Sequence, residues 1–141
     1  MSKGAATLTG GCLCGAVRYR ADGPPRSVVY CHCRMCQRAA GAPVVPWATF
    51  PAAQFAVTTG ELAEFASSPP ARRGFCRTCG TPLTFREIAE PDWIDITVAS
   101  LDDPAALPPR DHIWTESQVP WLRIDDDLPR HRRRRSDPSS G

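Results

Sequence analysis

The chain has 141 residues, of which 42% are hydrophobic and 23% charged, and this length and balance suit one compact domain rather than two. Its 15 prolines and 10 glycines argue against a helical bundle, because both residue types interrupt helices and favour short strands joined by turns. The formal net charge is only +2, and five of the arginines lie beyond residue 129, so the rest of the chain is slightly acidic and nucleic acid is not its expected partner.

The N-terminal residues predict a cytoplasmic protein whose domain begins near residue 10. Residues 1–9 are expected to form a leader, and Gly10 and Gly11 mark the turn that opens a domain over residues 10–129. The leader lacks the apolar core of a secretory signal. The charge-free stretch Ala39–Gly60 is broken by prolines, so we expect neither a membrane span nor a membrane partner.

Alternating and β-branched segments predict strands over most of the domain. They are expected at Val17–Arg20, Ser27–Cys33, Val44–Phe50, Arg73–Cys76, Thr81–Arg86, Trp93–Ala99 and His112–Thr115. Pro46 cannot donate a ladder hydrogen bond, so the strand that contains it is predicted to be an edge strand or to carry a bulge. The sequence therefore indicates a mainly β fold.

Three further segments complete the expected organisation. Arg34–Ala40 has helix formers followed by Gly41, which predicts one short helix with a glycine stop. Phe55–Thr58 and Glu61–Phe65 resemble a hairpin that turns at Thr59 and Gly60. Val119–Ile124 is expected to return to the domain with Trp121 in the core or a pocket wall, and residues 130–141 are predicted to be a disordered basic tail.

The seven cysteines fall into three groups along the chain. The groups are Cys12 with Cys14, then Cys31, Cys33 and Cys36, then Cys76 with Cys79. Metal binding explains such grouping better than disulfides in a reducing compartment, and an odd number cannot pair completely. Four thiolates close a tetrahedral zinc site, whereas three leave one position open, which is typical of a catalytic zinc. The grouping therefore predicts one closed site, from the first and last pairs, and one open site from the middle trio.

The spacing of the trio explains how three near neighbours in sequence can bind one ion. Alternate residues of an extended segment share a face, so Cys31 and Cys33 can meet one ion while His32 points away. A helical turn that starts next would bring Cys36 back toward the same point. A purely structural role for both zinc ions is the main alternative to an open catalytic site.

At this point the sequence resembles the glutathione-dependent formaldehyde-activating enzyme family. The resemblance is carried by the segments Gly11–Tyr19, Cys31–Cys36 with Gly41, Phe75–Leu83, His112–Trp114, Pro120–Trp121 and Asp127–Pro129. It implies several small twisted antiparallel sheets around zinc knuckles. It also implies a structural zinc on Cys12, Cys14, Cys76 and Cys79, and an exchangeable second zinc on Cys31, Cys33 and Cys36. The implied activity is the addition of glutathione or a similar small thiol to formaldehyde or another small aldehyde, which is classed as a carbon-sulfur lyase reaction.

Other polar residues are candidates for supporting roles. His32, Arg34 and His112 are candidate catalytic residues, and Arg34 or Arg38 could offset the net negative charge of a zinc ion with three thiolates. Glu116, Asp95 and Asp111 could carry a proton, although nothing in the sequence favours one of them. The competing hypothesis is a non-catalytic, zinc-stabilised binding module with a basic tail. The sequence does not indicate an oligomeric state.

Overall fold

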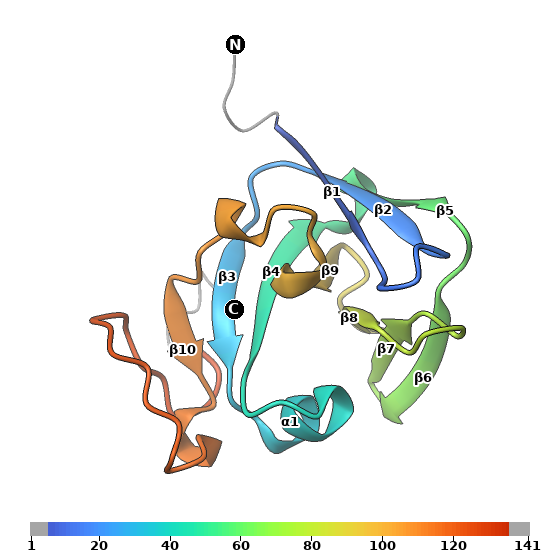
Figure 1. The fold of residues 1–141 in the computed structure, drawn as a ribbon. Helices are drawn as coiled ribbons and strands as arrows, with labels where there is room; N and C mark the ends of the chain where they lie inside the picture. Colours follow the sequence, from blue (N-terminus) through green and yellow to red (C-terminus); the bar gives the residue numbers. More distant parts are fainter. Residues whose placement is uncertain (1–5, 136–141) are drawn as a thin grey trace.

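The computed structural model describes residues 6–135, whose strands form two sheets (Figure 1). The smaller sheet has the order β1-β2-β5 and is antiparallel. The larger has the order β10-β3-β4-β9-β8-β7-β6, and all its pairs are antiparallel except β10 with β3. Figure 1 shows α1 at the opposite end of the molecule from β1 and β2. The predicted mainly β fold, with one short α-helix after the second cysteine group, is confirmed.

The element boundaries are as follows. The smaller sheet consists of β1 (Thr7–Gly11), β2 (Arg18–Asp22) and β5 (Phe55–Thr59). The larger sheet consists of β3 (Ser27–Cys31), β4 (Val45–Pro51), β6 (Ala63–Ser68), β7 (Ala71–Phe75), β8 (Pro82–Glu87), β9 (Trp93–Thr97) and β10 (Asp111–Ile113). The helix is α1 (Arg34–Ala40), and short 3-10 turns lie at Ala52–Gln54, Val98–Ser100, Pro104–Ala106 and Thr115–Ser117.

Two hydrophobic clusters use the alternating side chains of β4. Ala48 and Phe50 are fully buried in a cluster that joins the two sheets and includes Tyr19 of β2. Val45 and Trp47, which alternate with them, pack in a second cluster that includes cysteines of the trio. The trio is therefore built into a packed apolar region rather than carried on a free loop.

The short helix begins and ends as its sequence predicts. Cys33 is the N-cap residue, and its Sγ accepts a hydrogen bond from the backbone N–H of Cys36. Gly41 follows the last helical residue with φ 63°, a left-handed conformation that glycine adopts without steric cost, and its N–H donates to the carbonyl of Gln37. The prediction for Arg34–Ala40 is confirmed, including the glycine stop.

The prediction that Pro46 marks an edge strand is wrong. β4 lies between β3 and β9 in the centre of the larger sheet. Pro46 faces Tyr30 of β3, whereas the pairing of β4 with β9 begins one residue later, at Trp47 opposite Thr97. Because the proline precedes the first residue paired on that side, its missing N–H removes no hydrogen bond from the β4–β9 ladder.

The hairpin predicted across Thr59 and Gly60 is also absent from the described chain. β5 pairs with β2 in the smaller sheet, and β6 pairs with β7 in the larger one. Leu62, between the two strands, packs against the cluster that joins the sheets. Burying this leucine directs the chain from one sheet to the other instead of back along β5.

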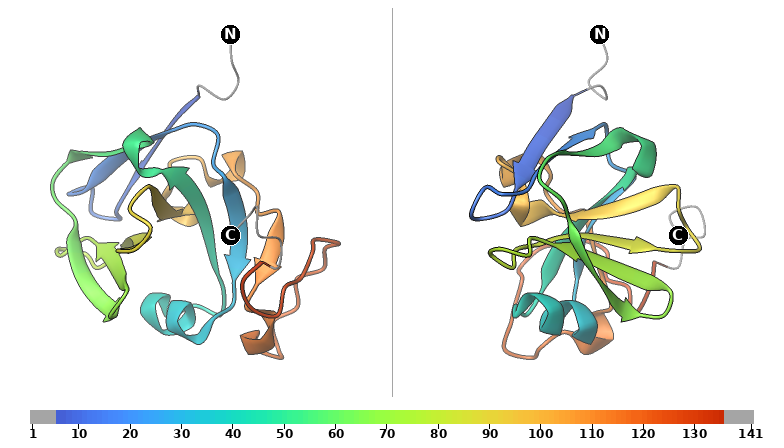
Figure 2. Two further views of the ribbon diagram at one scale, coloured as in Figure 1. Left: turned by 180° about the vertical axis from the view of Figure 1, so that it is seen from behind. Right: turned by 90° about the vertical axis from the view of Figure 1, so that its right-hand side faces the viewer.

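Both ends of the folded region extend beyond the expected boundaries. β1 begins at Thr7, inside the stretch expected to be a leader. At the other end, residues 129–133 run beside β10, as Figure 2 also shows: the N–H of His112 donates to the carbonyl of Pro129, and that of Trp114 to the carbonyl of Arg133. Residues 130–135 thus differ from the expected disordered tail, and the rest of that tail lies outside the described residues.

The segment that follows β10 departs from the sequence expectation as well. Val119–Ile124 forms no strand, and the side chain of Trp121 is 73% exposed rather than part of the core or a pocket wall. Within residues 6–135, no helix is long and apolar enough to cross a membrane.

Candidate metal centres and an adjoining pocket

The structure brings the first and last cysteine pairs together. Cys12 and Cys14 come from the loop between β1 and β2, and Cys76 and Cys79 from the turn between β7 and β8. Their four Sγ atoms lie within 4.8 Å of one another, with 3.7 Å between Cys12 and Cys14 and 3.8 Å between Cys14 and Cys76. Sulfurs about 2.3 Å from a tetrahedral zinc lie about 3.8 Å apart. The donor set and its spacing therefore fit zinc.

Backbone groups turn toward the sulfurs of this four-cysteine cluster. The N–H of Val17 lies 3.2 Å from Cys12 Sγ, and the N–H groups of Thr78 and Cys79 lie 3.3 and 3.4 Å from Cys76 Sγ. Gly80 ends the turn with φ 80° and donates to the carbonyl of Cys76. These donors stabilise negative charge on sulfur, which a metal-binding thiolate requires.

Thr81 links the two loops, a role that the sequence did not reveal. Its Oγ1 accepts a hydrogen bond from the N–H of Leu13 and contacts Cys79 Sγ at 3.2 Å. Hydrogen bonds from Thr81, with further backbone donors, lower the pKa of Cys79 to about 5.

The middle trio forms a second cluster at the junction of β3 and α1. Cys31 ends β3, Cys33 caps α1, and Cys36 lies in its first turn. Their Sγ atoms lie within 4.8 Å of one another, and among residues 6–135 no fourth histidine, cysteine, aspartate or glutamate joins them. Hydrogen bonds from the thiols of Cys31 and Cys36 hold the pKa of Cys33 well below its usual range. The hydrogen bond between Cys31 and Cys33 in turn raises the pKa of Cys31. Three sulfurs that share protons in this way fit a soft divalent cation such as zinc.

His32 and His112 lie together on the far side of the backbone from the trio. Both are fully buried, their rings stack, and His32 Nε2 lies 2.9 Å from His112 Nδ1. His112 Nε2 in turn lies 3.0 Å from a carboxylate oxygen of Asp126. Burial lowers the pKa of His32 to about 4, so the ring is neutral at pH 7. This hydrogen-bonded chain anchors the segment between Cys31 and Cys33.

The remaining candidates for supporting roles are engaged outside the trio. Arg34 is exposed and donates to Gln37 Oε1, and Asp95 accepts a hydrogen bond from Thr49. Asp111 pairs with Arg135, and Glu116 pairs with Arg132 and Arg133. Of the arginines proposed to offset charge, only Arg38 lines the pocket that adjoins the trio.

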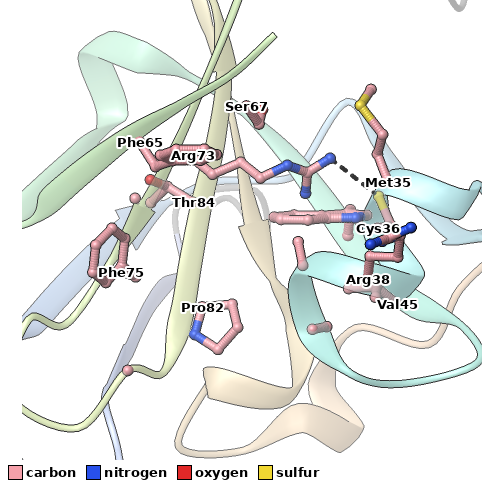
Figure 3. Close-up of a pocket in the computed structure, with 15 residues that line it drawn as sticks. Met35, Cys36, Arg38, Val45, Phe65, Ser67, Arg73, Phe75, Pro82 and Thr84 are labelled. Carbon is pink, nitrogen blue, oxygen red and sulfur yellow. Dashed lines mark hydrogen bonds between the residues drawn. The ribbon is translucent and has the colours of Figure 1, made fainter.

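A cavity of about 660 Å³ opens beside Cys36 (Figure 3). Its walls come from α1, β4, β6, β7 and β8, and its apolar lining includes Met35, Trp47, Phe65, Phe75 and Pro82. The volume is within the range of small-molecule pockets. The trio therefore adjoins a space large enough for a substrate, and its lining also includes Gly80, next to the four-cysteine cluster.

Arg73 contacts the trio, and sequence analysis did not identify it. Its Nη2 lies 3.7 Å from Cys36 Sγ, drawn as the dashed line in Figure 3, and its guanidinium lies 4.9 Å from the centre of the Phe85 ring. The arginine belongs to β7, 37 residues from Cys36 in sequence, so only the order of strands in the sheet brings the two together. The guanidinium of Arg73 therefore lies beside the trio, where the sequence suggested that Arg34 or Arg38 could offset negative charge.

Comparisons with known proteins cover both cysteine clusters. The sequence model of the family described as glutathione-dependent formaldehyde-activating enzyme matches residues 7–117. A protein of Halomonas elongata, provisionally named as a glutathione-dependent formaldehyde-activating enzyme, is 29% identical over an alignment of 129 residues, and the match covers 84% of this chain and 81% of the relative. A crystal structure of a Rhodobacter sphaeroides protein is similar with a TM-score of 0.57 and 26% identity, over 72% of this chain and 92% of that one.

Proposed function

Since the chain belongs to the glutathione-dependent formaldehyde-activating enzyme family, we propose that it joins a small-molecule thiol to formaldehyde or another small aldehyde. Glutathione or a similar thiol is the proposed first substrate. In this reaction the sulfur bonds to the carbonyl carbon and the carbonyl oxygen takes up a proton, so that the product is an S-hydroxyalkyl adduct. The reverse reaction breaks the same carbon-sulfur bond, which is the chemistry of a carbon-sulfur lyase.

One observation carries this proposal: the trio offers three sulfur ligands beside a pocket, and no fourth metal-binding side chain of residues 6–135 joins them. A tetrahedral ion held by Cys31, Cys33 and Cys36 would keep one position for an external ligand. The four-cysteine cluster, by contrast, offers a full set of ligands. We therefore assign the four-cysteine cluster to a structural zinc and the trio to a second zinc that takes part in the reaction.

The residues around the trio have separable roles in the proposed reaction. Cys31, Cys33 and Cys36 would hold the zinc ion, which would lower the pKa of a bound thiol and so favour its thiolate at neutral pH. Arg73 offsets the excess negative charge of three cysteine thiolates, because its guanidinium lies beside Cys36 Sγ. Trp47, Phe65 and Phe75 line the pocket with apolar surface, which limits competition by water. The hydrogen bond between His32 and His112 fixes the segment that carries Cys31 and Cys33.

Replacing one cysteine of each cluster tests these assignments. In Cys36→Ser we expect one zinc per chain to be lost, the fold to persist and thiol-dependent aldehyde consumption to fall to the uncatalysed rate. In Cys76→Ser we expect a loss of folding stability, because the mutated cluster joins the β1–β2 loop to the β7–β8 turn. Zinc analysis measures the metal content, circular dichroism measures the fold and its stability, and nuclear magnetic resonance with labelled formaldehyde measures aldehyde consumption. Full retention of zinc and turnover in Cys36→Ser would contradict the proposal.

The state of the cysteines fits a reducing compartment. All seven are free thiols in the structure, although several lie close enough in space to share protons. Oxidation of the trio would remove its ligands, so the proposed site needs reducing conditions, and we propose the cytoplasm as its compartment.

A further inference from the structure

Polar atoms without hydrogen-bond partners gather in the pocket beside the trio. Among residues 6–135, five buried side-chain polar atoms have no partner, and three of them belong to residues that line this pocket. These three are Arg73 Nε, Ser67 Oγ and Thr84 Oγ1. An unmet buried polar group costs about 1–3 kcal/mol, so such a concentration in one pocket indicates that bound water or a polar ligand completes it.

Thr84 differs from the other two. It pairs with Gly74, and a Cβ atom at Gly74 would lie 2.1 Å from Thr84 Oγ1. The threonine hydroxyl therefore occupies the space left by the missing glycine side chain. Arg73 and Ser67 remain as the two polar groups of the β6–β7 wall, and Figure 3 shows both on the same side of the pocket.

Contacts of the guanidinium hold Arg73 in place, although its Nε has no hydrogen-bond partner. Nη2 faces Cys36 Sγ, and Phe85 supports the guanidinium plane. Nε–H and the parallel N–H of Nη2 form a planar pair of donors, while the other N–H of Nη2 faces Cys36 Sγ. Such a pair matches the two oxygens of a carboxylate better than a single neutral acceptor. The hydroxyl of Ser67, also in the lining, is a third donor.

The charge of the pocket favours the same ligand class. Its lining includes Arg38 and Arg73 but no aspartate or glutamate. The rest of the lining is mostly apolar, so an anion would meet little competing negative charge and would be partly shielded from water. A cation or an uncharged sugar would leave the Arg73 donors without a matched acceptor.

We propose that Arg73 and Ser67 form a carboxylate-binding subsite for the thiol substrate. One N–H of Arg73 Nη2 faces the cysteine trio, and Nε with Ser67 receives the carboxylate, so a single arginine sets the distance between the reacting sulfur and the anionic end of the substrate. Arg73 is here a binding residue. The identity of the substrate as a thiol rests on the proposed function, whereas the preference for a carboxylate rests on the pocket itself.

The test uses two probes that differ at one group, N-acetylcysteine and its methyl ester, with the zinc-loaded full-length protein and isothermal titration calorimetry. The variants are Arg73→Gln, Arg73→Lys and Ser67→Ala. Arg72→Gln is the matched control, because it removes the same charge from the neighbouring residue of β7, whose side chain instead donates to backbone carbonyls near the β6–β7 turn. Zinc content and thermal midpoint are measured for each protein.

We expect the wild type to bind the acid at least about tenfold more tightly than the ester, as a charge-assisted contact predicts. The ratio of the affinity for the acid to that for the ester should fall toward one in Arg73→Gln and recover only in part in Arg73→Lys. It should fall by about threefold in Ser67→Ala and stay unchanged in Arg72→Gln. If Arg73→Gln loses zinc, Ser67→Ala still decides, because Ser67 lies on β6 and belongs to neither cysteine cluster.

Equal wild-type affinity for acid and ester, no binding of either probe, or an unchanged ratio in both Arg73→Gln and Ser67→Ala would overturn the subsite. Turnover of glutathione and formaldehyde is measured on the same wild-type preparation. Preference for the acid without turnover would reject the proposed reaction and keep the subsite. Turnover without preference for the acid would reject the subsite and keep the proposed reaction.

Discussion

Asp95 gives a quantitative prediction that does not depend on the metal. The residue lies on β9 between Thr49 of β4 and Phe85 of β8, and the Thr49 hydroxyl donates to its carboxylate at 2.5 Å. Burial raises the pKa of Asp95 to about 6, despite the hydrogen bond from Thr49. The folded protein thus holds the Asp95 proton more tightly than the unfolded chain does, and ionisation of Asp95 disfavours folding above that pH.

The size of the effect follows from the two pKa values. A change from about 4 in the unfolded chain to about 6 in the folded protein is worth about 3 kcal/mol, which we reduce to about 2 kcal/mol because the side chain is partly exposed. The penalty is full above pH 6 and disappears as the pH falls toward 4. Asp95→Asn keeps the oxygen that accepts from Thr49 but cannot ionise, so it should be about 2 kcal/mol more stable than the wild type at pH 8 and equally stable near pH 4.

Urea unfolding of both proteins between pH 4 and pH 8 measures this difference. Both proteins have the same cysteines, so any loss of metal at low pH affects both and cancels in the comparison. A stability difference that stays constant over this pH range, or a variant less stable than the wild type at pH 8, would refute the reasoning.

Three further predictions concern other parts of the fold. Thr81→Val removes the hydrogen bonds to Leu13 and Cys79, so the free energy of unfolding should fall by about 2 kcal/mol and a chelator should remove zinc faster; unchanged release would contradict the linking role of Thr81. Phe50→Ala empties a fully buried position between the sheets and should cost about 3–5 kcal/mol in urea unfolding, and a cost below 1 kcal/mol would place Phe50 outside the core. Replacing Arg132, Arg133 and Arg134 together by glutamine should leave turnover unchanged, because these side chains are 83%, 69% and 76% exposed; a wild-type affinity for nucleic acid that collapses in this variant would instead favour the binding-module hypothesis.

Local features of the sequence were sufficient to predict the cysteine groups and the helix. Residues in an extended segment alternate, and a helical turn returns after three residues, so the approach of Cys31, Cys33 and Cys36 depends on geometry within six residues. The stop at Gly41 is equally local. The placement of His32 away from the trio follows from the same alternation.

Features set by strand order could not be predicted. Pro46 lies in a central strand because the ladder with β9 begins one residue after it, and the sequence does not contain that register. Arg73 reaches Cys36 because β7 lies across the pocket from α1, a relation between distant segments. The arginines after residue 129 were expected in solution because their composition is polar, yet acidic partners such as Glu116 and Asp111 hold them beside β10.

The most direct test of the two-site assignment is cadmium-113 nuclear magnetic resonance of the protein with both sites filled by that isotope. We predict two resonances, of which only the one missing in Cys36→Ser shifts when glutathione is added. Two resonances that both stay in place with saturating glutathione would contradict the claim that the cysteine trio leaves a metal position for the thiol.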